Sequence, residues 1–179
     1  MSSTSHYPAA PAAQGIETHT LSVIVDNEPG VLARVIGLFS GRGYNIDSLT
    51  VSETEHEAHL SRITIVTTAA PMVIEQIKAQ LERLVPIHSV TDLTVKGNPV
   101  ERELALVKVA GKGEKRVEAL RLAEAFRASV IDASTEHFIF EITGKFSKIE
   151  QFVVLMQPLG LVEVSRTGLA AISRGPERM

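Results

Sequence analysis

The apolar residues of the chain recur first with the period of a strand and then with that of a helix. Residues 19–26 alternate between apolar and polar side chains, which predicts a strand with one face toward a core. From about Pro29 to Gly41 the apolar side chains lie three and four positions apart, which predicts a helix. Asn27 is expected to cap this helix, and the nearby glycines to end it. The expected buried stripe has four members: Leu32, Val35, Ile36 and Phe39.

Four further segments complete a first unit. Residues 45–53 and 60–67 alternate like two strands joined by a polar hairpin tip, with Ile63 and Ile65 facing inward. Ile46 is out of phase with its strand, which indicates a bulge or a turn at the strand's start. A helix opened by Pro71 follows, and a last strand spans residues 87–95. This β-α-β-β-α-β order predicts the ferredoxin-like arrangement, with two helices on one face of an antiparallel sheet.

The same order of elements recurs in the second half, although no second copy of the Asn27-Glu28-Pro29-Gly30 turn is present. The fold class is therefore α+β, with two ferredoxin-like βαββαβ units. We expect a domain at residues 18–96, a linker at 97–102 and a second domain at 103–179. The segments expected in the second domain are strands at 104–110, 129–133, 136–143 and 161–165, and helices at 114–127 and 145–156.

Composition narrows the class of protein. The 179 residues are 44% hydrophobic but only 4% aromatic, so the core should be mostly aliphatic. The net charge of −3 and a pI of about 6.1 favour neither nucleic acid nor an acidic membrane as a partner. The absence of cysteine excludes disulfides and thiolate sites and suits a reducing cytoplasm. Residues 1–17 lack the apolar run of a signal peptide and are expected to be a disordered extension.

The candidate binding chemistry lies at the start of the first helix. Gly30 leaves backbone amides uncovered at the positive end of the helix dipole, where a carboxylate could bind. Taken alone, this pattern fits equally well a turn that merely starts a helix. No P-loop, dinucleotide fingerprint or nucleophile signature is present, so no catalytic residue is assigned. His56 and His59 could join nearby glutamates in binding a metal, but charged residues at a hairpin tip are usually solvated, and no metal site is assigned.

Longer stretches carry a resemblance to a known family. The turn Asn27–Leu32 looks like that of an ACT domain, the ferredoxin-like module that senses amino acids. Its continuation over Arg34–Val51 resembles the regulatory small subunit of acetolactate synthase (acetohydroxyacid synthase). Further matching stretches are Ser61–Ile65, Gln76–Val85, Val100–Val109, Ile131-Asp132, Gly168 and Ser173-Arg174-Gly175, so that the resemblance covers about residues 18–176.

The resemblance implies a function that the pattern alone does not. Such subunits activate a large catalytic subunit carrying thiamine diphosphate, Mg²⁺ and FAD, and confer feedback inhibition by valine, sometimes by leucine or isoleucine. The first unit would be the ACT domain, forming a homodimer, and the second would serve activation of the large subunit. The implied effector residues are Asn27, Gly30, Val31, Leu32, Asn45 and Ile46. Asp26 and Pro29 depart from the family pattern, and Pro29 removes one amide donor.

Two other functions stay open at this point. A stand-alone enzyme is disfavoured, because the chain shows no cofactor motif of its own. An ACT sensor could also serve another biosynthetic enzyme, and identifying the protein's partner would decide between them. The resemblance further suggests that Asn27 of one chain and Asn45 of a second chain hold one ligand together.

Overall fold

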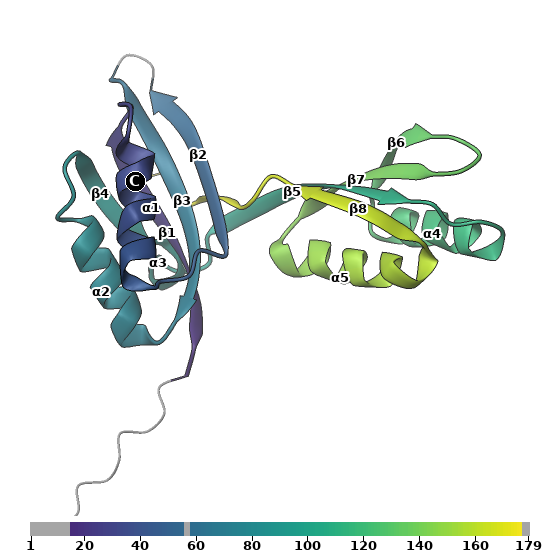
Figure 1. Ribbon diagram of the computed structural model, residues 1–179, viewed down its shortest axis with the longest axis horizontal. Helices are drawn as coiled ribbons and strands as arrows, with labels where there is room; N and C mark the ends of the chain where they lie inside the picture. Colours follow the sequence, from purple (N-terminus) through teal and green to yellow (C-terminus); the bar gives the residue numbers. More distant parts are fainter. Residues whose placement is uncertain (1–14, 56–57, 177–179) are drawn as a thin grey trace, which may run out of the picture.

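The computed structural model describes residues 15–55 and 58–176, which form two lobes joined by a narrow waist (Figure 1). The predicted disordered segment therefore lies mostly outside the described residues, as do His56 and Glu57 of the hairpin tip. No helix among the described residues is long and apolar enough to cross a membrane.

The first lobe contains seven elements. Their bounds are β1 (Glu17–Asp26), α1 (Val31–Arg42), β2 (Ser48–Glu55), β3 (Leu60–Ala69), α2 (Pro71–Leu81), β4 (Ile87–Asp92) and α3 (Leu93–Lys96). β1 begins two residues before the predicted strand, because Glu17 already pairs with Ala69 of β3. The last predicted strand is too long: the Asp92 carboxylate accepts hydrogen bonds from the Thr94 and Val95 amides, and this N-cap starts α3.

The second lobe repeats the plan. Its bounds are β5 (Val100–Val109), α4 (Glu114–Ala125), β6 (Ser129–Ala133), β7 (Phe138–Gly144), α5 (Phe146–Met156), a 3₁₀ turn η1 (Gln157–Leu159), β8 (Leu161–Arg166) and β9 (Ala170–Ile172). The strand orders are β2-β3-β1-β4 and β6-β7-β5-β8, all antiparallel. In both lobes the long helices cover one face of the sheet (Figure 1). This confirms the predicted pair of ferredoxin-like units.

The core of the first lobe is aliphatic, as expected. Leu21, Val23 and Val25 of β1 pack with Ile63 and Ile65 of β3 beneath the two long helices. Burying each of these side chains stabilises the fold by about 1.5–3 kcal/mol.

The predicted stripe of α1 is half wrong. The helix turns Val31, Val35 and Phe39 toward the sheet, at a spacing of four residues. Leu32 and Ile36 are 37% and 38% exposed, because they lie one position further around the helix. Two large apolar side chains of α1 thus remain on the surface.

The core of the second lobe is also mostly aliphatic, but it includes three phenylalanines. Phe138, Phe140 and Phe152 are buried at its centre, and the rings of Phe140 and Phe152 meet edge to face at 6.1 Å. The small side chains of Ala119 and Ala123 form the buried face of α4 against them. These small side chains face the large rings of the sheet and α5, and Leu122 of α4 packs against the margin of the same core.

The chain crosses between the lobes twice. The first residues of β5, Val100–Arg102, pair with β9, whereas the rest of β5 pairs with β7 and β8. A two-stranded ribbon therefore occupies the waist, and part of the expected linker at 97–102 is β-strand. The division of the chain into domains at that point stays a prediction.

Candidate functional site

The turn between β1 and α1 is longer than the sequence pattern suggested. Asn27 does not cap α1. Its backbone N–H donates to the His59 carbonyl oxygen at 2.6 Å, and its side chain is exposed. Gly30 takes the cap position, with φ +88° in the left-handed region. The predicted cap is wrong because the chain needs three further residues to turn before the helix begins. The Asn27 amide group is thereby left at the surface beside the start of the helix.

The start of α1 is open. A Cβ atom built on Gly30 would meet nothing within 4 Å, while its φ favours glycine. The first N–H groups of an α-helix have no intrahelical acceptor. The Val31 amide reaches the Glu28 carbonyl oxygen in a long 3.4 Å contact, so the amides of Gly30 and Leu32 are the more available donors. The Val31 side chain is buried in the core and contributes only its backbone here.

Asp26 at the end of β1 already has a partner. Its carboxylate oxygen Oδ1 lies 2.6 Å from His88 Nε2. The side chain of Arg34, one turn into α1, is also engaged, since it donates to the Val85 carbonyl oxygen at 2.8 Å. These contacts tie the turn to the segment before β4.

Asn45 and Ile46 lie beyond the other end of α1. The helix ends at Gly43 in the left-handed conformation, and Ile46 packs partly against the core before β2 begins. The Asn45 carbonyl oxygen accepts a hydrogen bond from Thr67 at 2.7 Å. Its side-chain Nδ2 donates to Asp47, whose second carboxylate oxygen accepts from Thr68 at 2.6 Å. A carboxylate can only accept, so the contact with Asp47 fixes the orientation of the Asn45 amide group.

Within one chain, the structure does not bring the predicted site residues together. Asn27, Gly30 and Leu32 lie at the start of α1, whereas Asn45 and Ile46 follow its end. A helix of twelve residues spans about 18 Å. A free amino acid is too small to contact both groups in the same chain.

A cavity that sequence reasoning missed lies between the lobes. Its volume is about 1110 Å³, and its lining includes Asp47 from the first lobe and Lys145 and Phe146 from the second. The Arg166 guanidinium also lines it, bound through two nitrogens to the buried Glu103 carboxylate at 2.7 and 2.9 Å. The hydrogen bonds to Glu103 raise the pKa of Arg166 despite its partial burial. No sequence signal identified this cavity, because its walls come from segments far apart in the chain.

His19 and His137 make side-chain contacts typical of structural roles. His19 lies 2.7 Å from Asp92 and 3.2 Å from Glu17. Burial lowers the pKa of His19, but the hydrogen bonds to these two carboxylates outweigh it and raise the pKa above its usual value. His137 contacts Asp132 and Ser134 in the loop after β6. The described residues contain no group of three His, Cys, Asp or Glu side chains able to hold a metal ion.

The fold of the first lobe and the open, glycine-capped start of α1 define the class of an ACT domain. Residues 21–89 match the family described as the AHAS small subunit-like ACT domain, and residues 102–175 match the small subunit of acetolactate synthase.

Whole-chain relatives agree with these matches. A probable acetolactate synthase small subunit of Archaeoglobus fulgidus is 46% identical over 89% of this chain and 99% of its own length. The isozyme 3 small subunit of Salmonella typhimurium is 43% identical over 89% and 97% of the two chains. The crystal structure of the acetolactate synthase small subunit from Thermotoga maritima matches with a TM-score of 0.79 at 41% identity. The match covers 90% of this chain and 99% of that one. The chain belongs to the family of acetolactate synthase small subunits.

Proposed function

We propose that this chain activates the catalytic large subunit of acetolactate synthase and makes it subject to feedback inhibition by valine. The large subunit would carry thiamine diphosphate, Mg²⁺ and FAD and form 2-acetolactate from two pyruvates in the cytoplasm, and this chain alone would be inactive. The observation that carries the proposal is the open start of α1 at Gly30, in a chain of this family.

The carboxylate of valine binds at the start of α1. The amides of Gly30 and Leu32 lie at the positive end of the helix dipole, which stabilises an anion by about 0.3–2 kcal/mol. The exposed Asn27 side chain lies beside this helix end and donates a further hydrogen bond. The glycine at position 30 matters twice: its left-handed φ builds the turn, and its missing side chain leaves room for the ligand.

The ammonium group of valine binds to Asn45. Because Nδ2 of Asn45 donates to Asp47, Oδ1 is the atom left to accept a hydrogen bond from the ligand. The valine side chain packs near Ile46 and the exposed Leu32, which adds about 1.5–3 kcal/mol. With the helix-end term and the hydrogen bonds, the total is about 4–8 kcal/mol, or a dissociation constant between about 1 mM and 1 μM.

Two chains form each site. A two-fold axis across α1 sets two such helices antiparallel, so that Gly30 of one chain faces Asn45 of the partner subunit. β2 is an edge strand of the first sheet and carries the exposed Val51, and α1 carries the exposed Leu32 and Ile36. Pairing β2 with its copy would satisfy the free edge and cover these side chains.

The site is tested most directly at Gly30. Gly30→Asp places a carboxylate against that of the ligand, whereas Gly30→Asn tolerates the same φ without the charge. We expect Gly30→Asp to abolish measurable valine binding by calorimetry and Gly30→Asn to weaken it less. Equal valine affinities of Gly30→Asp and the wild type would rule out this site.

Mixed dimers test the two-chain arrangement. Asn27→Ala and Asn45→Ala are made separately and combined, with subunit exchange blocked during the measurement. If each site uses both chains, one site of the mixed dimer carries both changes and the other carries neither. We then expect one valine to bind per dimer with near-wild-type affinity. If the two residues act within one chain, no wild-type site returns.

The regulatory role is tested by reconstitution. We expect no acetolactate formation from pyruvate by the purified chain alone. Adding it to the large subunit should raise that subunit's activity and make it sensitive to valine. Acetolactate formation by the chain alone, or failure to bind the large subunit, would contradict the proposal.

A further inference from the structure

Two hydrogen bonds join the two lobes at one residue. Both backbone polar groups of Leu169 bind side chains of β2: its amide donates to Ser48 Oγ at 3.0 Å, and its carbonyl oxygen accepts from Thr50 Oγ1 at 2.9 Å. We call these two hydrogen bonds the clasp. Leu169 directly precedes β9, so the clasp fixes the returning strand of the waist to the first sheet.

The residues around the clasp are closely packed. A Cβ atom on Gly168 would lie 2.9 Å from Thr50 Cγ2 and 3.0 Å from Ser48 Oγ, and the φ of Gly168 is +83°. Leu169 and Ala171 are each only 5% exposed. A glycine is thus required for the strand to approach β2, and the contact excludes water.

On the side of the second lobe, the clasp is attached to rigid structure. Thr167 Oγ1 accepts from the Leu104 amide at 3.1 Å, and the Thr167 amide donates to the Leu104 carbonyl oxygen at 3.0 Å. One residue earlier, Arg166 binds the buried Glu103. A displacement of Leu169 would therefore move β5 and β8 rather than a loose tail.

On the side of the first lobe, the clasp lies next to the proposed effector site. Ser48 is the first residue of β2 and comes three positions after Asn45. Between them, Asp47 binds the Asn45 side chain and Thr68 and also lines the cavity between the lobes. The cavity leaves the lobes in contact at a few places, of which the clasp and a 2.9 Å hydrogen bond from Thr20 to Glu101 are two.

We propose that the clasp transmits the state of the effector site to the second lobe. This inference rests on the proposed function. In it, Ser48 and Thr50 are the residues through which valine alters the activity of the large subunit. A ligand that draws Asn45 toward a partner chain displaces the start of β2. The clasp converts that displacement into a change in position of β5 and β8, and the cavity gives the lobes room to move.

The experiment compares variants in the complex with the large subunit. Ser48→Ala with Thr50→Val removes both side-chain partners of Leu169 while preserving their approximate volume. Ser52→Ala is the matched control, because Ser52 lies two residues further along the same face of β2 and makes no hydrogen bond to Leu169. Thermal unfolding of each variant verifies folding. Calorimetry gives the dissociation constant of valine for the small subunit, and the pyruvate assay gives inhibition of the complex.

For the double variant, we expect the valine concentration that half-inhibits the complex to rise by about 2- to 30-fold, the range reported for residues that carry coupling. The dissociation constant for the small subunit should stay within about twofold, and Ser52→Ala should behave as the wild type. Unchanged inhibition would overturn the proposal, and so would an equal loss of direct valine binding, since Ser48 and Thr50 would then belong to the binding site.

Hydrogen exchange keeps this inference separate from the proposed function. In the wild type, valine should change the exchange of the amides of residues 167–172, and this change should vanish in the double variant. If the wild type binds valine but exchange in this segment does not respond, the clasp proposal fails while the proposed function stands. If the wild type neither binds valine nor responds to it, both fail.

Discussion

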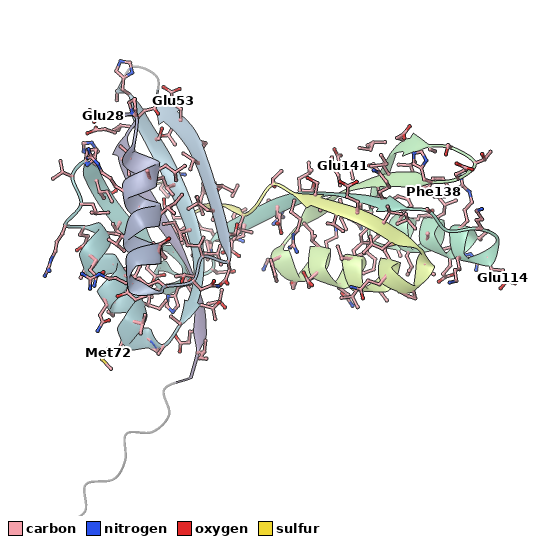
Figure 2. All side chains as sticks on the ribbon, in the orientation of Figure 1. Glu28, Glu53, Met72, Glu114, Phe138 and Glu141 are labelled. Atoms are coloured by element: carbon pink, nitrogen blue, oxygen red, sulfur yellow. The ribbon has the colours of Figure 1, made fainter. Side chains whose placement is uncertain are left out.

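The two lobes share one topology but start their first helices differently. α1 begins after Gly30, and its first turn, within the fully described residues 31–42, contains no acidic side chain. α4 begins after Gly113 with Glu114 in its first turn, so the helix carries its own carboxylate at the positive end. Figure 2 places Glu28, in the turn before α1, and Glu114 at opposite ends of the molecule.

The turns before the two helices differ as well. Gly111, in the turn before α4, is buried, and a Cβ atom there would meet the Leu159 carbonyl oxygen at 2.5 Å. The Ala110 amide also donates to the Gly160 carbonyl oxygen at 2.8 Å, so η1 closes over this turn. At the caps themselves the two lobes agree, because a Cβ atom on Gly30 or on Gly113 would meet nothing within 4 Å. The second helix start therefore differs from the first through the covered Gly111 before it and the Glu114 carboxylate in its first turn, and a shared fold does not imply a shared site.

The largest effect is expected from separating the lobes. A fragment ending at Lys96 keeps the open start of α1 but loses the second lobe together with Leu169, which binds Ser48 and Thr50 of the first sheet. We expect it to bind valine and to give no activation of the large subunit, measured by calorimetry and by the pyruvate assay. Full activation by the fragment would show that the lobes do not divide these roles.

Core truncations test whether the lobes are stabilised separately. Phe39→Ala in the first lobe and Phe152→Ala in the second remove rings that are at most 1% exposed. Each should lower the free energy of unfolding by about 3–5 kcal/mol. Hydrogen exchange measured at increasing denaturant concentration should show that protection is lost mainly in the altered lobe. An equal loss of protection in both lobes would show that they unfold as one unit.

A charge placed at each helix start compares the two turns directly. Gly30→Asp should weaken valine binding by at least about 10- to 100-fold, equivalent to about 1.4–2.8 kcal/mol. Gly113→Asp makes the same change at the other cap, where φ is also positive, and should leave the valine dissociation constant unchanged. Calorimetry of both variants is the measurement. A comparable loss in Gly113→Asp would place a binding site in the second lobe as well.

The smallest effect concerns pH and is confined to the first lobe. The pKa of His19 is raised in the folded protein, so its ion pair with Asp92 stabilises fully below the usual pKa of histidine. That stabilisation fades as the pH rises through the raised pKa. Glu17 and Lys78 also face this pair. We expect the difference in unfolding free energy between the wild type and His19→Gln to be larger at low pH, by about 1 kcal/mol. A pH-independent difference would contradict this.

Most of the fold followed from residue periodicity. The alternation of Leu21, Val23 and Val25 predicted the central strand of the first sheet, and Pro71 predicted the start of α2. The errors have physical causes. Asn27 was expected to cap α1 because asparagine is a common helix cap. Its backbone N–H instead donates to the carbonyl oxygen of His59, and the helix begins only after Gly30. The last strand was extended too far, because the pattern does not reveal that Asp92 caps a short helix.

The candidate site was predicted only as a set of residues. The glycine and the flanking asparagines could be recognised in the chain, since their chemistry is local and their order resembles a family. Their separation along α1 could not be seen before the helix had definite ends. The clasp and the cavity were not foreseen either, because they join β2 to residues more than a hundred positions away.

The sequence by itself determined the strands and long helices of the two repeated units, their order and the glycine at the first helix start, because each depends on residues close together in the chain. Tertiary structure alone decided which side of α1 faces the sheet, how Asp47 orients Asn45, and how Leu169 returns to the first lobe. These depend on the register of strands and on contacts between distant segments, and no local pattern of residues specifies them.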